Sequence, residues 1–215
     1  MSLRTRVRAL ILGAWKFNSG DYWETRYRAG GTSGLGSYNQ LAEYKAEFLN
    51  RFVAKNHIQT VAELGCGDGA QLSLAGYAQY VGYDVSRTAV ALCRERFASD
   101  PTKQFIRLTD RTPVQSADLM LSLDVIYHLV EDDVFERYMQ KLFGGAGRFV
   151  IIYSSNKDEM TNDAHVRHRQ FTKWVSAERQ DFTLSGHAPN RYPHDPQNPD
   201  TTTFADFYVF RRLGR

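Results

Sequence analysis

Several features that would place this 215-residue sequence in a special class are scarce or missing. It has two cysteines, Cys66 and Cys93, which are too few for a disulfide scaffold and lack the spacing of a metal site. No apolar stretch approaches the roughly 20 residues that cross a bilayer. Three arginines precede a short apolar run at 10–15, but no small-residue cleavage site follows, so this start resembles a signal peptide only superficially. We therefore expect a cytoplasmic chain without stable membrane insertion.

A strong charge of one sign is also missing. The formal net charge is only +3, so the composition does not demand a nucleic-acid partner. Hydrophobic residues make up 42% of the chain, which is enough for one sizeable α/β domain with an appended lid. The oligomeric state cannot be read from these numbers.

The most informative run begins with an apolar stretch at 60–64 and continues into three alternating glycines, Gly65, Gly67 and Gly69. This pattern predicts a strand that ends in a tight loop, because glycine lets the backbone turn sharply and approach a ligand. A second predicted strand, 79–84, ends in Asp84. A carboxylate at that position lies near the ribose hydroxyls of a bound nucleotide in a doubly wound fold. An adenosine-containing cofactor is therefore predicted.

The remaining elements alternate between strand and helix patterns. Strands are predicted at 60–64, 79–84, 103–108, 117–123 and 147–153, and helices at 39–56, 70–75, 87–98 and 131–143. Such alternation is typical of a parallel sheet with helices on both faces. After a helix that begins at 171, two strands at 181–185 and 203–210 have no helix between them and should pair antiparallel.

These patterns predict a doubly wound, mostly parallel seven-stranded sheet that closes with an antiparallel C-terminal hairpin. Residues 1–57 are expected to form an N-terminal helical lid, with helical pieces at 5–16 and 21–27 and a glycine-rich loop at 30–37. Residues 58–215 are expected to form the cofactor-binding domain.

Two cofactors fit the glycine run. Gly65-x-Gly67-x-x-Ala70 satisfies the loose dinucleotide fingerprint, so an NAD(P)-dependent oxidoreductase is one alternative. Against it, the motif begins about 60 residues into the chain and leaves no room for a second catalytic domain. In addition, Glu63 stands where dehydrogenases usually carry an apolar residue, and the last two strands are expected to be antiparallel.

The run from Glu63 to Gly69 closely resembles motif I of class I S-adenosylmethionine-dependent methyltransferases. Asp84 matches the acidic residue that follows their second strand, and residues 118–129 look like their fourth-strand motif. The resemblance implies S-adenosylmethionine as cofactor and methyl transfer as activity. A non-catalytic cofactor-binding protein on the same fold stays open as a further alternative.

The resemblance implies roles for individual residues. Glu63 would hold the amino end of the cofactor directly or through water, and Asp84 would accept hydrogen bonds from both ribose hydroxyls. The adenine would lie between Val85 and the corner at 108–110. The full set implied for cofactor binding is Trp23, Arg26, Glu63, Gly65, Cys66, Gly67, Asp84, Val85, Thr109 and Leu123.

The segment before the first strand contains residues that would cover the bound cofactor. Trp23-x-x-Arg26-Tyr27 resembles the lead-in helix of many small-molecule methyltransferases, in which an aromatic residue covers the methionine end. Because Trp23 and Tyr27 are one helical turn apart, ordinary core packing explains them equally well. The loop at 30–38 suits either a lid that excludes water or a plain connector.

Candidate residues for the transfer step follow the fourth strand. An oxygen or nitrogen nucleophile needs a base, and Asp124 and His128 are the candidates, although a structural role suits both residues as well. Tyr38, Tyr127 and His165 are candidates for contact with the acceptor, and the group at 165–169 is expected to contact substrate or solvent. No acid cluster predicts a metal.

A small molecule or a sugar unit is the preferred acceptor. The sequence has no Asn/Asp-Pro-Pro-Tyr/Phe motif of the kind found in enzymes that methylate base amines, and it has little net basicity. We therefore expect no nucleic-acid partner.

Overall fold

The computed structural model describes residues 17–214, so the helix predicted at 5–16 lies outside the described residues. The helices are α2 (Ser19–Arg28), α3 (Asn39–Lys55), α4 (Arg87–Arg96), α5 (Asp132–Gly145) and α6 (Phe171–Glu178). The strands are β1 (Thr60–Leu64), β2 (Gln79–Asp84), β3 (Lys103–Arg107), β4 (Ala117–Leu123), β5 (Ala146–Ser154), β6 (Glu159–Met160), β7 (Arg167–His168), β8 (Phe182–Ala188) and β9 (Asp206–Arg212). Single 3₁₀ turns are η1 (Leu35–Ser37), η2 (Leu72–Leu74), η3 (Ile126–His128) and η4 (Pro199–Thr201).

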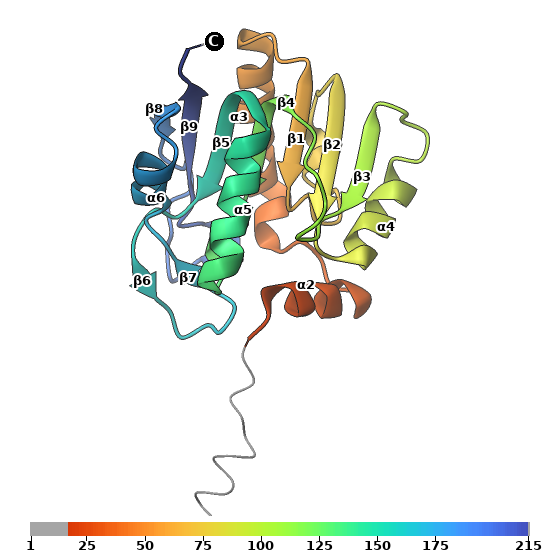
Figure 1. Cartoon of the computed structure of the whole chain (residues 1–215). Coiled ribbons are helices and arrows are strands. Elements are labelled where there is room, and N and C mark those ends of the chain that lie inside the picture. The colour runs from red at the N-terminus through yellow and green to blue at the C-terminus, as the bar shows by residue number, and fades with distance from the viewer. Residues whose placement is uncertain (1–16, 215) are drawn as a thin grey trace, which may run out of the picture.

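Seven strands form one twisted sheet in the order β3-β2-β1-β4-β5-β9-β8 (Figure 1). The five strands from β3 to β5 are parallel, and β9 pairs antiparallel with both β5 and β8. The predicted mostly parallel sheet with an antiparallel C-terminal hairpin is therefore confirmed.

Alternate residues of the central strands face opposite sides of the sheet, as the two-residue period of a strand requires. Val61 and Leu119 belong to a buried cluster with α3 and α4, whereas Ala62 and Met120 belong to a cluster with α5 and α6. Figure 1 shows α5 in front of the sheet and α3 behind it. Because α3 contributes to the core, it is a structural layer of the domain, and within residues 17–57 only α2 and the loop after it lie over the edge of the sheet.

The helix predicted at 70–75 is wrong. The chain forms only the 3₁₀ turn η2 there, in which the N–H of Ser73 is shared between the carbonyls of Gly69 and Ala70. The segment between β1 and β2 has to make the glycine turn and then return to β2, so little length is left for a helix. The side chain of Asn50 on α3 bonds the carbonyl of Leu74 and the N–H of Gly76, and so holds this segment against α3.

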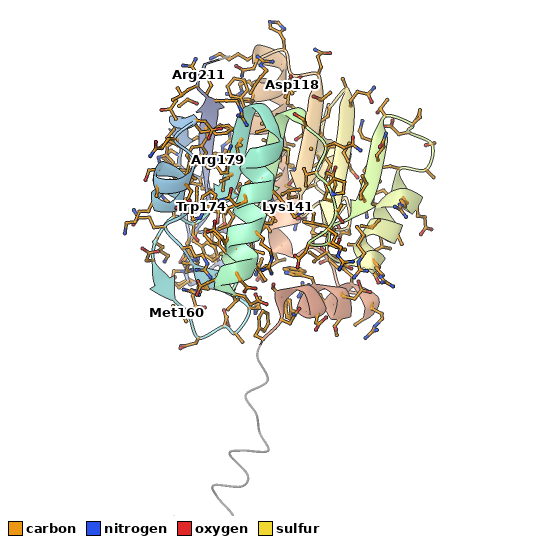
Figure 2. All side chains as sticks on the ribbon, in the orientation of Figure 1. Asp118, Lys141, Met160, Trp174, Arg179 and Arg211 are labelled. Carbon is orange, nitrogen blue, oxygen red and sulfur yellow. The ribbon has the colours of Figure 1, made fainter. Side chains whose placement is uncertain are left out.

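The sequence did not predict the strands β6 and β7. The short strands β6 and β7 pair antiparallel as a hairpin between β5 and α6, with Met160 largely exposed on β6 (Figure 2). The described helices include none that is both long enough and apolar enough to cross a membrane.

Candidate functional site

A cavity of about 260 Å³ lies at the carboxyl ends of β1, β2 and β4. Residues of α2 also line it, so this helix covers the cavity. This edge is where ligands bind in open α/β sheets. The residues predicted for the site that line the cavity are Trp23, Glu63, Gly65, Cys66, Gly67, Asp84, Val85, Thr109, Leu123, Asp124 and His128. The tertiary structure thus brings most of the predicted set together.

The glycine loop has a backbone that only glycine adopts easily. Gly65 and Gly67 have φ angles of 89° and 58°, in the left-handed region. A Cβ on Gly65 would collide with Val125, and a Cβ on Gly67 would collide with the hydroxyl of Ser33. The loop therefore has no room for a side chain at these two positions, and its backbone forms one wall of the cavity.

Asp84 ends β2 and is held by two backbone donors. Its Oδ2 accepts from the N–H of Gly67 at 3.0 Å and its Oδ1 accepts from the N–H of Ser86 at 2.8 Å. Burial raises the pKa of this carboxyl to about 6 in spite of these two bonds. Each oxygen keeps a further lone pair, so the carboxylate is able to accept from two more donors in the cavity.

Glu63 lies on β1 and is almost fully buried. The hydroxyl of Tyr80 donates to its Oε2 at 2.6 Å. Burial raises the pKa of Glu63 to about 7, although the Tyr80 bond and the charge of Lys45 act in the opposite direction. A ligand cation placed near this carboxylate would favour its ionised form.

Asp124 follows β4 in the left-handed conformation, with a φ of 59°. Its Oδ2 is 2.5 Å from the ammonium of Lys45, and its Oδ1 accepts from the hydroxyl of Tyr127 at 2.9 Å. Lys45 comes from α3, lines the cavity and is only 1% exposed. Both oxygens of Asp124 are therefore engaged within the protein.

Lys45 was not predicted as a site residue, although the sequence carries a signal for it. It stands midway between Leu41 and Leu49 on the apolar face of α3, four positions from each, and both leucines are buried. A charged residue on the core face of a helix has to be paired, because an unpaired buried charge is strongly destabilising.

His128 ends the turn η3 and faces the cavity. Its Nδ1 is 2.9 Å from the carbonyl oxygen of His165, and because a carbonyl only accepts, the proton must be on Nδ1. Burial lowers the pKa of His128 to about 4, so the ring is neutral at pH 7. No described residue hydrogen-bonds Nε2, whose lone pair is therefore open to a proton donor.

The segment that covers the cavity, α2 and the loop at 29–38, is hydrogen-bonded to the glycine loop and to the residues at the start of α4. The N–H and hydroxyl of Ser33 bond the carboxylate and N–H of Asp68, and the hydroxyl of Tyr38 donates to Asp68 at 2.7 Å. On α2, Glu24 accepts from the hydroxyls of Ser86 and Thr88. The Ser86 bond is the main cause that lowers the pKa of Glu24 to about 2.

Four predicted site residues do not line the cavity. Arg26 donates to the carbonyl of Thr32 at 2.8 Å, and the hydroxyl of Tyr38 is engaged by Asp68. Tyr127 is buried behind Asp124, and the ring of His165 stacks on Tyr22 with centroids 4.9 Å apart. Direct ligand contact by these four residues stays a prediction.

The group at 165–169 was expected to contact substrate or solvent, and for His168 this is wrong. His168 is buried, and its Nδ1 lies 2.6 Å from the hydroxyl of Ser155. Its neighbours Arg167 and Arg169 bond Asp132 and the carbonyls that follow η3. Among the described residues, no group of three or more His, Cys, Asp or Glu side chains is arranged to hold a metal ion.

Sequence reasoning also missed one acidic residue in the cavity wall. Glu131, just before α5, accepts from the N–H of Ser19 through Oε1 at 2.9 Å. Its Oε2 is buried and has no partner among residues 17–214. The only signal in the sequence is an acid next to the acids that begin α5, which is an ordinary pattern for a helix start.

Known proteins that resemble this chain in sequence include methyltransferases. Residues 62–146 match the family model described as a methyltransferase domain. Two probable S-adenosylmethionine-dependent methyltransferases, from Mycobacterium tuberculosis strains CDC 1551 and H37Rv, are each 30% identical over 115 residues, which is 50% of this chain and 42% of theirs. The chain thus spans less than half the length of these curated relatives.

Two solved structures share the fold. The N-methyltransferase NodS from Bradyrhizobium japonicum, with bound S-adenosylhomocysteine, is 14% identical with a TM-score of 0.66 and covers 92% of this chain and 100% of its own. Magnesium protoporphyrin IX methyltransferase from Synechocystis, with the same ligand, is 15% identical with a TM-score of 0.64, over 89% of this chain and 97% of its own. At such identity these likenesses concern the fold alone.

Proposed function

We propose that this chain, whose residues 62–146 match the methyltransferase-domain family model, is a class I S-adenosylmethionine-dependent methyltransferase that transfers a methyl group to an oxygen or nitrogen atom of a small molecule or sugar unit. The cofactor of the domain is S-adenosylmethionine. One observation carries the proposal for the whole chain. The same cavity contains two carboxylates suited to the cofactor, Glu63 and Asp84, and a neutral histidine with an open lone pair, His128.

Asp84 and Glu63 would hold the two polar parts of the cofactor. The free lone pairs of Asp84 suit the two ribose hydroxyls, because a carboxylate that accepts from hydroxyls makes charge-assisted bonds. Glu63 suits the amino group, directly or through water, and it lies one strand away from Asp84 in the parallel pair β1–β2. Val85 and Thr109 would pack against the adenine, and Trp23 would cover the bound molecule from α2.

The transfer is an in-line displacement at the methyl carbon. The bond from the acceptor oxygen or nitrogen to carbon forms while the carbon–sulfur bond breaks, and its electron pair stays on sulfur as the neutral thioether S-adenosylhomocysteine. The acceptor proton would pass to Nε2 of His128, which is open and neutral at pH 7. Asp124 suits this task less well, because its carboxylate is paired with the buried ammonium of Lys45, and a proton on Asp124 would leave that charge without its partner.

The covering segment supports a small acceptor. Contacts from Glu24, Ser33 and Tyr38 fasten α2 and the loop at 29–38 over the cavity, which suits a lid over residues 58–215. A closed cover excludes water and favours compact acceptors over a duplex or a folded protein. The formal net charge of +3 agrees, because nucleic-acid binding relies on many cationic contacts.

The proposal is tested by supplying methyl-labelled S-adenosylmethionine with hydroxyl- and amine-bearing small molecules and sugars. We expect S-adenosylhomocysteine to form with at least one acceptor, and we expect His128→Gln to abolish most of this turnover. His187→Gln is the matched control, because His187 is exposed on β8, contacts Asp206 and the ring of Tyr208, and does not line the cavity. Label found only on carbon, or only on protein or nucleic acid, would contradict the proposed acceptor class.

A further inference from the structure

The β6–β7 hairpin lies against the loop that carries His128, although the two are far apart in the sequence. The carbonyl of His165, in the turn of the hairpin, is the acceptor for Nδ1 of His128, 37 residues earlier. The ring of His165 also stacks on the ring of His128, with centroids 5.5 Å apart and planes at 11°. The ring of Tyr22 on α2 also stacks on the ring of His165, with centroids 4.9 Å apart.

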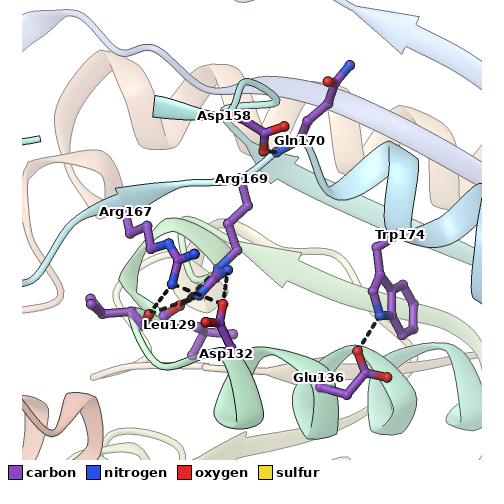
Figure 3. Close-up of polar contacts among 9 residues, drawn as sticks. Leu129, Asp132, Glu136, Asp158, Arg167, Arg169, Gln170 and Trp174 are labelled. Atoms are coloured by element: carbon purple, nitrogen blue, oxygen red, sulfur yellow. Dashed lines mark hydrogen bonds and ion pairs between the residues drawn. The ribbon is translucent and has the colours of Figure 1, made fainter. Parts of the chain in front are cut away.

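Two arginines fix the position of the hairpin (Figure 3). Arg169 bonds Asp132 at 2.6 Å, donates to the carbonyls of Leu129 and Val130, and places its guanidinium over the ring of Phe135. Arg167 bonds the same carboxylate at 2.9 Å and the carbonyl of Val130 at 3.0 Å. Asp132 begins α5 immediately after the loop that follows His128. The bonds of Arg167 and Arg169 to Asp132 therefore tie the hairpin to the segment that carries His128.

The base of the hairpin is closed separately. Asp158 accepts from the N–H of Gln170 at 2.8 Å, and Ser155 bonds the buried ring of His168 at 2.6 Å. The hairpin is therefore held at its base, and the side chains of Arg167 in β7 and Arg169 just after it tie it to Asp132 and to the carbonyls that follow His128. This double fastening leaves the His165 carbonyl little freedom relative to Nδ1 of His128.

We propose that the β6–β7 hairpin is a positioning element for His128, in which the His165 carbonyl keeps the ring proton on Nδ1 and leaves the Nε2 lone pair open to the cavity. Arg167, Arg169 and Asp132 are the positioning residues that keep this carbonyl in place. The description of His128 as a base rests on the proposed function, whereas the tautomer does not. Without the carbonyl, an imidazole is free to carry its proton on Nε2, and a protonated nitrogen cannot accept a proton from the substrate.

The tautomer is measured directly from the ring nitrogen shifts of His128 in two-bond ¹H–¹⁵N spectra of the full chain, assigned with His128→Gln. In the wild type we expect a protonated Nδ1 and an unprotonated Nε2 at pH 7. In Arg169→Gln we expect a mixture in which the Nε2–H form gains population, and in Arg169→Lys a partial return. Arg179→Gln is the matched control. Arg179, which is labelled in Figure 2, pairs with Asp181, reaches the carbonyl of Phe143 and covers the rings of Phe143 and Phe182, and none of these residues lines the cavity.

A wild-type ring with its proton on Nε2, or an Arg169→Gln spectrum identical to wild type, would overturn the proposal. If Arg169→Gln does not fold, Arg167→Gln replaces it, because Arg167 is the more exposed of the two. Once an acceptor is known, Arg169→Gln should lower kcat by roughly 10- to 100-fold with little change in KM, as part of the roughly 10²–10⁴-fold that a positioned base contributes. A wild type that shows the expected tautomer but transfers no methyl group would contradict the proposed function and leave the tautomer result intact.

Discussion

The cavity has two sides that are built in different ways. On the side of β2, Asp84 is held by the N–H groups of Gly67 and Ser86, and Glu63 by Tyr80, so every partner lies within 17 positions in the sequence. On the side of β4, Asp124 depends on Lys45, 79 positions away, and His128 on His165, 37 positions away. The difference teaches that a local motif builds the part expected to hold the cofactor, whereas distant segments build the part expected to meet the acceptor.

The largest effect is expected on the β4 side. His128→Gln should lower kcat by roughly 10²–10⁴-fold, because it removes the lone pair proposed to take the acceptor proton. Binding of S-adenosylhomocysteine, measured by calorimetry, should stay within a few-fold of wild type if the two sides act separately. Equal losses of ligand binding and turnover in His128→Gln would contradict the separation of the cavity into a cofactor side and an acceptor side.

Lys45→Met tests the buried pair on the β4 side. It leaves the mostly buried carboxylate of Asp124 without its cation, and we expect the free energy of unfolding to fall by about 3 kcal/mol. Lys45→Met with Asp124→Asn should recover a large part of this loss, because no charge is then left buried. Arg51→Met, which breaks an exposed pair with Glu47 on the same helix, should cost less than about 1 kcal/mol. Equal losses for the two single variants in denaturant titrations would show that the buried pair contributes no more to stability than the exposed one.

Asp84→Asn tests the β2 side. The amide loses the charge and one acceptor oxygen, so binding of S-adenosylhomocysteine should weaken by roughly 10- to 100-fold, the loss expected for one hydrogen bond to a charged group. Asp100→Asn is the matched control, since Asp100 lies outside the cavity and bonds Thr102 and Lys103. Full affinity in Asp84→Asn would remove Asp84 from the cofactor site.

The smallest expected effect is a pH dependence of binding that belongs to the β2 side. In the free protein burial raises the pKa of Glu63 to about 7 and that of Asp84 to about 6, so both carboxyls hold protons as the pH falls below these values. The ammonium and the ribose hydroxyls of S-adenosylhomocysteine favour the ionised carboxylates, and binding should therefore release protons. Its affinity should fall by roughly fivefold as the pH drops from 8 to 6.5, because Glu63 and, to a smaller extent, Asp84 take up protons in the free protein.

Calorimetry in buffers of different ionisation enthalpy measures this proton release. Glu63→Gln should flatten the dependence near pH 7, while His128→Gln should leave it unchanged. A flat profile in the wild type would mean that neither carboxyl titrates with the ligand.

The sheet was predictable because its signals are local. Five apolar runs, each followed by turn residues, gave the parallel strands to within one or two residues of β1 to β5. The helix expected at 70–75 failed because the apolar residues there satisfy a helix pattern, while the short crossover to β2 leaves room only for the turn η2. The hairpin of β6 and β7 escaped prediction because two-residue strands carry almost no periodicity.

The sequence by itself determined the strands of the sheet, the glycine loop and the carboxylates at the ends of β1 and β2, because the signal for each of these lies in residues that are close together in the chain. The tertiary structure decided the rest. It paired Lys45 with Asp124, turned Tyr38 toward Asp68 and placed the His165 carbonyl on Nδ1 of His128. These contacts join segments that are 30 to 79 positions apart in the sequence and that only the packed fold brings together, so no local pattern predicts them.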